Sequence, residues 1–352
     1  MSEFLLISQH GKWSASTRSR ALRFEGLFER EFDTVHYCIP NSLPIRRPGR
    51  IGQILYFARH GFNFVEQYRR IQSHANSADV IFVQRGLYGI GPGWIARPIE
   101  KASGRVILDL DDNLFVETPA MRGKGRLARW LYGPQQVQRV LERADEVIVS
   151  TNQLAAELGG VAKKIHIIPT LPEVDKYPRS VQSLRGPIQL VWAGTRGGLA
   201  YLDFLADELS LLAREGVAEL TVICSEPWSG PAHFLQWKLE GEEARLASFD
   251  AGIMPLPDTP YAKSKAGYKL LQYMASGMPV IASPIGINRQ LVEQSGAGYL
   301  CSSSEEWKNA ITEMYRNRSK ASLMGQRGLT FVAEYASPSE LDSQLLKVIK
   351  PS

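Results

Sequence analysis

The stretch from Gly252 to Glu293 constrains the fold most, because it alternates short apolar runs with polar and glycine-containing segments. Gly252–Leu256 and Val280–Ala282 are apolar runs too short for helices, so they predict buried strands. Between them, Gly267–Ser276 shows helical spacing and is followed by Gly277, a residue typical of helix C-termini. Strand, helix and strand in this order predict a βαβ unit of a parallel sheet.

Three lysines surround the expected start of this helix. Lys263 and Lys265 lie in the polar loop before it, and Lys269 follows Gly267 closely. A helix N-terminus offers unpaired backbone N–H groups and the positive end of a dipole, and a glycine lets the backbone approach a ligand. Cations at that end are unfavourable unless an anion is present, so the pattern favours a bound phosphate or diphosphate. The alternative is that the lysines are solvated loop residues.

The rest of the chain repeats the alternation of strands and helices. Apolar runs predict further strands at 4–8, 35–39, 80–84, 106–112, 146–150, 165–169, 188–195, 220–224, 235–238 and 298–301. Amphipathic spacing predicts helices at 18–30, 51–74, 135–144, 199–215, 240–247, 304–317, 319–335 and 341–349. The expected fold class is therefore α/β.

Length and prolines together predict two domains. A chain of 352 residues is long enough for two domains of ordinary size. The prolines between Pro169 and Pro187 indicate an interdomain linker. We therefore expect an N-terminal domain over 1–172 and a C-terminal domain over 185–335.

The composition is that of a soluble globular protein, with 44% hydrophobic and 22% charged residues. The sequence contains no run of about 18 apolar residues, the length that would span a bilayer. Its first residues lack the basic region and the long apolar core of a signal peptide, so a first strand is expected there. The three cysteines are far apart, which suits reduced thiols in a cytoplasm and predicts neither a disulfide framework nor a zinc site.

The net charge of +5 is unevenly distributed. Residues 1–175 contain 23 Lys and Arg against 18 Asp and Glu, and residues 176–352 contain 18 against 18, so the whole excess lies in the first half. The basic segment MRGKGRLARWLYG, at 121–133, fits either a contact with an anionic membrane or a mobile loop closing over an acceptor. A merely soluble surface is the alternative explanation of the excess. No nucleic-acid partner is expected, because no binding motif appears.

The region around Gly267 resembles the C-terminal nucleotide-sugar site of glycosyltransferase family 4, retaining enzymes of the GT-B architecture. The family signature has two Glu separated by seven residues, followed by Leu-Glu-Ala-Met-Ala-x-Gly-x-Pro-Val-Ile-Ala. The matching positions are Gly267, Leu271, Met274, Gly277, Pro279, Val280, Ile281 and Ala282. Ser264 and Gln272 replace the two Glu. Lys265 to Met274 is similar to a bacterial branch with Lys-x-x-x-Lys-Leu-Leu-Gln-Tyr-Met at this place.

The resemblance implies a GT-B fold, in which two Rossmann-like domains face each other across a cleft and a last helix, within 336–352, crosses back to the first domain. It also implies that the C-terminal domain binds a UDP- or GDP-linked sugar without a metal ion or another cofactor. The positions matched to donor binding are Gly194, Thr195, Arg196, Lys263, Ser264, Lys265, Ala266, Gly267, Tyr268, Lys269 and Gln272. Gln272 is expected at the ribose. Arg196 and the lysines are expected at the diphosphate, because the family's usual lysine after the glycine turn is missing.

The N-terminal domain is expected to carry the acceptor side of the site. Gly11 and Arg18 lie in or just after the loop that follows the first strand, where the family often has Ser-x-x-Arg. Arg18 or Arg20 is expected to contact the acceptor or a phosphate, and solvated arginines on a helix are the alternative. Arg85 follows a buried strand, at the end where ligands of parallel sheets gather, so it is a further candidate for the acceptor or phosphate side of the site.

Asp111 and Asp112 match the family's His-Asp pair at the end of a strand, with Asp111 in the place of His. They are expected to be catalytic, orienting or deprotonating the acceptor hydroxyl or binding the transferred sugar. A structural helix N-cap is the alternative. Asp109-Leu110-Asp111 also imitates the metal-binding Asp-x-Asp of the other glycosyltransferase architecture, but the predicted second domain does not fit that fold.

The leading hypothesis is a retaining, metal-independent glycosyltransferase of cell-surface polysaccharide synthesis, cytoplasmic and in peripheral contact with the plasma membrane. It would move a sugar from a nucleoside-diphosphate sugar to a hydroxyl of a glycan or lipid-linked acceptor. A non-catalytic homologue that binds a nucleotide sugar and serves as a partner or regulatory subunit is the alternative, because both family Glu are replaced. A nucleotide-sugar epimerase of the same architecture is disfavoured by the close match over Met274 to Ala282.

Overall fold

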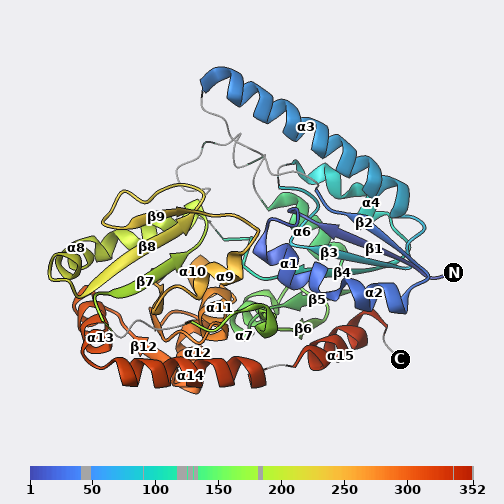
Figure 1. The fold of residues 1–352 in the computed structure, drawn as a ribbon. Helices are drawn as coiled ribbons and strands as arrows, with labels where there is room; N and C mark the ends of the chain where they lie inside the picture. The colour runs from blue at the N-terminus through green and yellow to red at the C-terminus, as the bar shows by residue number, and fades with distance from the viewer. Residues whose placement is uncertain are drawn as a thin grey trace. The chain divides into compact units, whose positions relative to one another are not determined.

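The computed structural model describes residues 1–40, 49–89, 91–116, 125, 130, 134–180, 185–335 and 337–350. These residues form two compact units (Figure 1), Met1–Thr170 with Leu341–Ser352, and Leu171–Glu340. The basic segment predicted at 121–133 lies outside the described residues, apart from Gly125 and Trp130. The assignment of acceptor and donor roles to the two domains stays a prediction.

The first unit is built on a six-stranded parallel sheet of order β2-β1-β3-β4-β5-β6. Its strands are β1 (Glu3–Ser8), β2 (Thr34–Cys38), β3 (Val80–Gln84), β4 (Arg105–Leu110), β5 (Glu146–Val149) and β6 (Ile165–Ile167). Its helices are α1 (Ala15–Arg20), α2 (Glu25–Glu31), α3 (Gly49–His74), α4 (Arg97–Glu100), α6 (Gln135–Arg143), α7 (Asn152–Leu158) and α15 (Pro338–Ile349), with short 3-10 turns η1 (Leu22–Phe24) and η2 (Gly93–Ala96). In the central register, Leu6 is paired with Phe82 and Phe82 with Ile107.

Both faces of this sheet are buried, because successive side chains of a strand point to opposite faces. On β1, Leu5 and Ile7 belong to one core cluster together with Ile71 of α3. Phe4 points to the other face, where its ring stacks on that of Phe28 of α2 with centroids 4.4 Å apart. The strand therefore packs against α3 on one side and α2 on the other, which fixes where its carboxyl end lies.

The final helix, α15, is part of the first unit although it is distant in sequence. Lys350, just after α15, forms an ion pair with Glu31 of α2 at 3.1 Å. Arg105 of β4 donates a hydrogen bond to the carbonyl of Ile349 at 3.3 Å. These contacts, with buried Leu341 and Leu345, hold α15 at the end of the sheet where the strands begin.

The second unit is built on another six-stranded parallel sheet, of order β12-β11-β10-β7-β8-β9. Its strands are β7 (Ile188–Ala193), β8 (Ala218–Cys224), β9 (His233–Gln236), β10 (Ala251–Met254), β11 (Val280–Ala282) and β12 (Gly298–Leu300). Its helices are α8 (Ala206–Arg214), α9 (Glu242–Leu246), α10 (Pro260–Lys263), α11 (Tyr268–Ala275), α12 (Ile287–Ser295), α13 (Ser304–Arg316) and α14 (Arg318–Tyr335), with 3-10 segments η3 (Val174–Lys176) and η4 (Arg196–Leu205).

A tyrosine wedge fixes α11 on this sheet. Tyr273 is fully buried, and its hydroxyl accepts a hydrogen bond from the backbone N–H of Ala193 at 2.9 Å. A Cβ on Gly252 of β10 would lie 2.2 Å from the Tyr273 ring, so the close packing of helix on strand requires glycine there. The first turn of α11 is thereby set beside the carboxyl ends of β7 and β10.

The predicted α/β fold is confirmed, and the strands lie at or close to the predicted positions. Three segments, 18–30, 199–215 and 257–265, differ from the predictions. The helix predicted at 199–215 is a 3-10 segment, η4, followed by α8. Its apolar residues Leu199, Leu202 and Leu205 recur every third position, the period of a 3-10 helix, and two glycines in its first turn disfavour an α-helix.

The polar loop predicted at 257–265 contains a short helix, α10. Thr259 caps it by accepting a hydrogen bond from the backbone N–H of Ala262 at 3.2 Å, and Pro260 occupies the first helical position. The predicted continuous helix over 18–30 is likewise divided into α1, η1 and α2.

Candidate active site

In open parallel sheets, ligands bind beyond the carboxyl ends of the strands, where the strand order reverses. In the second unit the order reverses between β7 and β10. The glycine turn 194–198 follows β7, and the loop 255–265 follows β10. The predicted donor residues therefore surround the point at which a ligand of this sheet is expected.

Lys269 contacts the glycine turn directly. Its Nζ lies 4.3 Å from the ring centroid of Trp192, the buried penultimate residue of β7. A Cβ on Gly194 would lie 2.7 Å from Lys269 Nζ and 2.6 Å from the Trp192 ring. A cation from the first turn of α11 and the backbone of the turn after β7 are thus brought together around one glycine.

The other predicted cations of the donor side have different surroundings. Lys263 forms an ion pair with Asp258 at 2.6 Å, and Arg196 forms one with Glu226 at 3.1 Å; all four side chains are exposed. Such exposed pairs contribute little to stability, so an anionic ligand can replace the carboxylate at small cost. Lys265 lies over the ring of Tyr261, with Nζ 4.5 Å from the centroid.

The two positions that replace the family Glu are both buried and engaged within the unit. Ser264 Oγ donates to the carbonyl of Tyr261 at 3.0 Å. Gln272 Nε2 donates to the hydroxyl of Tyr177 at 2.8 Å, and burial raises the pKa of that hydroxyl. The predicted contact of Gln272 with a ribose stays a prediction. Ala266 and Tyr268, at the start of α11, are partly buried, and Thr195 is exposed.

One glycine precedes each of the helices α11 and α12, and both have a positive φ. Gly267 has a φ of 70°, and a Cβ there would lie 2.7 Å from Leu291 of α12. Gly286, with a φ of 56°, approaches the Lys263 carbonyl so closely that a Cβ would lie 2.3 Å from its oxygen. Both positions therefore require glycine, and the loop carrying Lys263 is packed onto the turn after β11.

Asn288, in the first turn of α12, was not identified from the sequence. Its side chain is buried, and Nδ2 donates to the carbonyl of Ser283 at 3.3 Å. Its Oδ1 has no hydrogen-bond partner among the described residues, and a Cβ on Gly267 would lie 3.8 Å from it. The only sequence signal nearby was the turn at Gly286, which does not single out the asparagine.

In the first unit the strand order reverses between β1 and β3, and Gly11 and Arg85 follow those strands. Gly11 is buried under Trp13: a Cβ there would lie 1.9 Å from the ring. Arg18 donates to the carbonyls of Lys12 at 3.2 Å and Trp13 at 3.0 Å. Both residues therefore hold the loop after β1 in shape. Their predicted contact with an acceptor or a phosphate stays a prediction.

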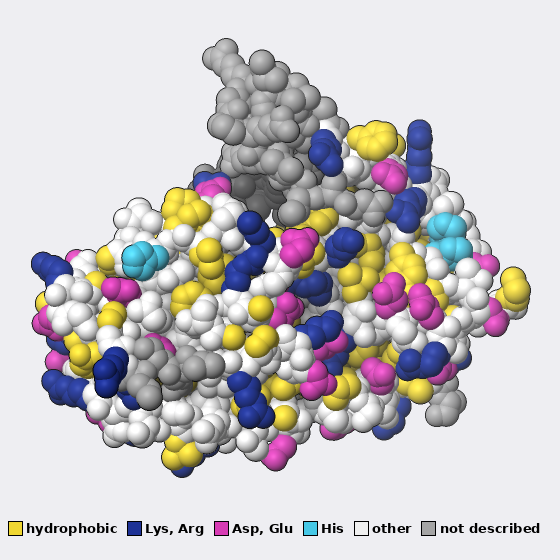
Figure 2. Space-filling view, viewed as in Figure 1, with side chains coloured by type: hydrophobic (Ala, Val, Ile, Leu, Met, Phe, Trp, Pro, Cys, Tyr) yellow, Lys and Arg dark blue, Asp and Glu magenta, His cyan; other side chains and the backbone are white. Residues whose placement is uncertain are grey.

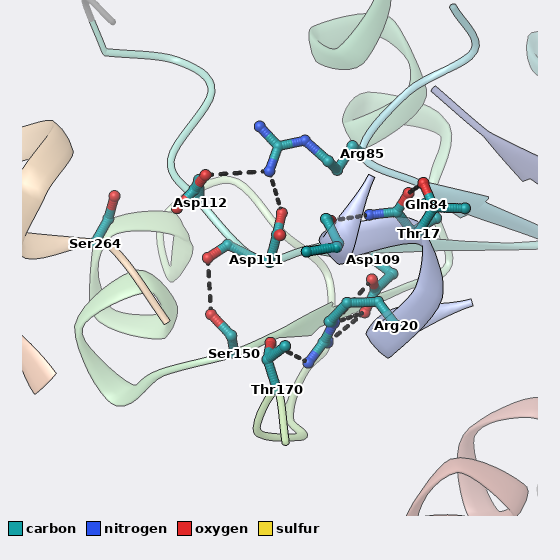
Figure 3. Close-up of polar contacts among 12 residues, drawn as sticks. Thr17, Arg20, Gln84, Arg85, Asp109, Asp111, Asp112, Ser150, Thr170 and Ser264 are labelled. Atoms are coloured by element: carbon teal, nitrogen blue, oxygen red, sulfur yellow. Dashed lines mark hydrogen bonds and ion pairs between the residues drawn. The ribbon is translucent and has the colours of Figure 1, made fainter. Parts of the chain in front are cut away.

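Arg85, Asp111 and Asp112 come together at the carboxyl ends of β3 and β4 (Figure 3). Arg85 Nη1 donates to Asp111 Oδ1 and, at 3.1 Å, to Asp112 Oδ2. The backbone carbonyl of Asp111 accepts a hydrogen bond from Ser150 Oγ at 3.0 Å. Neither aspartate is the N-cap of a described helix. Five residues were predicted for the acceptor side of the site: Gly11, Arg18, Arg85, Asp111 and Asp112. The structure thus brings the last three together.

A buried ion pair lies beside this group. Arg20 Nε donates to both carboxylate oxygens of Asp109, at 3.1 and 3.0 Å, and its Nη1 donates to Thr170 Oγ1 at 3.1 Å (Figure 3). The side chains of Arg20 and Asp109 are 3% and 2% exposed. Arg20 was predicted as an alternative to Arg18 for contacting a ligand; that prediction is wrong, because its guanidinium is buried on Asp109 and Thr170.

His10, in the loop after β1, was also missed by the sequence analysis. Burial, together with the positive charge of Arg85, lowers the pKa of His10 to about 3. The imidazole is therefore neutral at physiological pH. A Cβ on Gly89 would lie 3.6 Å from His10 Cε1, so the ring is held against the segment that follows β3.

We expect the first unit to lose stability as the pH falls below about 6.5, the ordinary pKa of histidine. The unfolded chain takes up a proton on His10 there and the folded chain does not, so unfolding becomes more favourable down to pH about 3. Thermal unfolding followed between pH 7.5 and 5 checks this, since solvent-exposed carboxylates stay ionised in that range. His10→Gln should reduce the dependence, and a part should remain because burial also lowers the pKa of His74. A variant that keeps the wild-type slope would show that His10 is protonated in the folded state.

A groove of about 580 Å³ in the second unit lies away from the strand carboxyl ends. It is lined by Arg179, Ser180, Gly277, Arg318, Ser319, Ser322, Leu323, Gln326 and Leu329. Gly277 lies between α11 and β11, at the amino-terminal edge of the sheet. This groove is therefore separate from the expected ligand position.

The described residues form neither a metal site nor a membrane-spanning helix. No group of three or more His, Cys, Asp or Glu is arranged to hold a metal ion within the described ranges. No helix among the described residues is both long and apolar enough to cross a membrane. In Figure 2, basic and acidic side chains are interspersed over the described part of the visible face. The predicted membrane contact stays a prediction.

Residues 190–317 match the family described as Glycosyl transferases group 1. This region contains the glycine turn after β7, all the predicted donor residues and the whole βαβ unit around α11. No curated protein matches the chain in sequence.

Several solved structures share the fold along nearly the whole chain. Sucrose-phosphate synthase from Thermosynechococcus elongatus is similar with a TM-score of 0.68 and 17% identity, covering 99% of this chain and 98% of that one. WaaG, a glycosyltransferase involved in lipopolysaccharide biosynthesis, gives 0.66 and 13%, covering 100% of both chains. Anabaena Alr3699/HepE in complex with UDP and glucose gives 0.66 and 16%, covering 99% of both chains. At these identities the likeness establishes the fold, and the fold of this protein is GT-B.

Proposed function

We propose that this protein is a retaining glycosyltransferase that moves a sugar from a UDP-sugar to a hydroxyl of a glycan or lipid-linked acceptor in cell-surface polysaccharide synthesis. The observation that supports this most directly is the contact between Lys269 and the glycine turn at Gly194. It puts a cation, a helix N-terminus and a glycine turn at the point where the strand order reverses. That combination binds and stabilises a diphosphate.

In this proposal the second domain, 185–335, binds the donor. Lys269 and the start of α11 stabilise the negative charge that develops on the UDP leaving group, without a metal ion. Lys265 and Arg196 add positive charge beside the diphosphate. Lys265 lies over the ring of Tyr261, and Arg196 pairs with the exposed carboxylate of Glu226. The fold-level relative that contains UDP supports uridine rather than guanosine as the base.

The first domain, 1–172, carries the acceptor side in this proposal, and the helix within 336–352 completes it. Asp111 and Asp112, at the end of β4, orient the acceptor hydroxyl or accept its proton. The enzyme would work in the cytoplasm, with a peripheral contact to an anionic membrane that brings it to a lipid-linked acceptor. The positive excess of residues 1–175 favours such a contact.

One observation favours the alternative of a non-catalytic nucleotide-sugar-binding protein. Neither position of the family Glu pair carries a carboxylate, and Ser264 and Gln272 are both engaged in hydrogen bonds within the unit. A protein of this kind would bind UDP and leave UDP-sugars intact.

We expect UDP to bind with an affinity that EDTA does not change, and UDP-sugars to be turned over. Isothermal titration with UDP and GDP, each with and without EDTA, measures the first result. Release of UDP from UDP-glucose, UDP-galactose and UDP-N-acetylglucosamine measures the second, with water as the acceptor. UDP binding without release of UDP from any of these sugars would favour the non-catalytic alternative. Absence of binding to either nucleotide would refute both.

A further inference from the structure

Arg85 has an unusual backbone conformation. Among the described residues it is the one non-glycine residue with a positive φ, 64°. The N–H of Gly86 donates to the carbonyl of Gln84 at 2.8 Å, which closes a three-residue γ-turn around Arg85. A γ-turn with a positive central φ is rare and strained. Strain of this kind persists where the surroundings impose it, and it occurs preferentially at functional sites.

The surroundings of Arg85 impose the turn from both sides. The N–H of Arg85 donates to the carbonyl of Asp109 at 2.8 Å. The preceding side chain, Gln84, is fully buried, accepts from Ser8 Oγ at 2.8 Å and donates to Ser16 Oγ at 2.6 Å. The end of β3 is therefore fixed, and the turn directs the Arg85 side chain toward the end of β4 (Figure 3).

The guanidinium of Arg85 lies between the carboxylates of Asp111 and Asp112, both within hydrogen-bond distance of one nitrogen. The three side chains are 13%, 12% and 16% exposed, so solvent screens them little. The Arg85 guanidinium therefore joins the two carboxylates at the end of β4. The adjacent Arg20 and Asp109 form a separate buried pair.

We propose that Arg85 is a positioning residue, which holds the Asp111 and Asp112 carboxylates for a hydroxyl acceptor. A hydroxyl donates a hydrogen bond to a carboxylate, and the guanidinium that would attract a phosphate is already engaged by both carboxylates. Arg85 is expected on the acceptor or phosphate side of the site, and its contacts favour the acceptor. This inference rests on the proposed glycosyltransferase function.

A comparison of Arg85→Gly with Arg85→Ala tests the strain. Both variants remove the guanidinium and leave the same two carboxylates, so they differ in the Cβ alone. Glycine adopts a positive φ freely, and we expect the first unit of the glycine variant to melt about 2–4 °C higher. At Arg139, inside α6, the order should reverse, because glycine weakens a helix. A glycine variant at position 85 that melts no higher than the alanine variant overturns the argument from strain.

Kinetics of UDP release from UDP-glucose, UDP-galactose and UDP-N-acetylglucosamine test the role. Arg85→Lys keeps the charge and loses the planar fork, so we expect kcat to fall about 10- to 100-fold with KM for the sugar nucleotide within about twofold. Asp111→Asn should have a similar effect. The double variant should fall little further, because the two residues act as a unit. UDP affinity measured by titration should not change in Arg85→Ala.

The outcomes separate this inference from the proposed function. If the wild type releases UDP and Arg85→Lys keeps its kcat, only the positioning role is wrong. A loss of UDP affinity in Arg85→Ala would place Arg85 at the phosphates and also overturn the role. A wild type that binds UDP but releases it from none of the three sugars favours the non-catalytic alternative, in which Arg85 has no acceptor to serve.

Discussion

Replacing Arg20 by alanine is expected to destabilise the first unit by about 3–5 kcal/mol, because it leaves the Asp109 carboxylate buried without its counter-ion. The variant also removes the hydrogen bond from Arg20 to Thr170, the last residue of the Met1–Thr170 segment of that unit. For a unit of this size the loss corresponds to a fall of roughly 6–20 °C in Tm. Calorimetry of the full chain, in which the two units give separate or overlapping transitions, measures it.

Two variants act as controls for Arg20→Ala. Arg30 of α2 forms an exposed pair with Asp342 at 3.6 Å, so Arg30→Ala should cost less than about 1 kcal/mol. Combining Arg20→Met with Asp109→Leu removes both charges and should recover most of the stability. If Arg20→Ala costs no more than Arg30→Ala, the buried pair does not hold β4 and α1 together.

The sequence predicted the fold well because its signals are local. Runs such as residues 80–83 are apolar on both faces, as strands buried between two layers of helices must be. Helix ends were marked by residues with one strong preference, such as Gly277 after α11. The main error, a continuous α-helix over 199–215, arose because the three-residue period of η4 resembles the helical period over so short a segment.

The site was less predictable because its contacts join distant parts of the chain. Lys263, Lys265 and Lys269 were equivalent in the sequence, and only the packing of α11 beside β7 puts Lys269 against Gly194. Arg20 looks like an ordinary helix arginine until β4 brings Asp109 to it. A positive φ at Arg85 leaves no trace in the residue type. Asn288 and His10 were missed for the same reason: nothing adjacent in sequence marks them as buried.

Replacing Lys269 by methionine is expected to weaken UDP binding about 10- to 150-fold. The variant removes a cation from the expected diphosphate position, and a charge-assisted hydrogen bond contributes about 1.5–3 kcal/mol. Methionine keeps the aliphatic contact with Trp192. Turnover should fall further than affinity, because the charge on the diphosphate increases as the sugar leaves. Isothermal titration with UDP and the UDP-release assay measure the two effects.

Gly194→Ala provides an independent approach to the same contact. Its Cβ would lie 2.7 Å from Lys269 Nζ and 2.6 Å from the buried Trp192 ring, so both the lysine tip and the turn itself must shift. The Gly194→Ala variant should therefore lose UDP affinity as Lys269→Met does. The double variant, with both substitutions, should lose little more affinity than either one alone. Lys320 is the matched control, since it lies over the Tyr299 ring but pairs with Glu313 on the surface. Lys320→Met should leave UDP binding unchanged. Equal losses from Lys320→Met and Lys269→Met would mean that general charge, and not the contact at Gly194, governs binding.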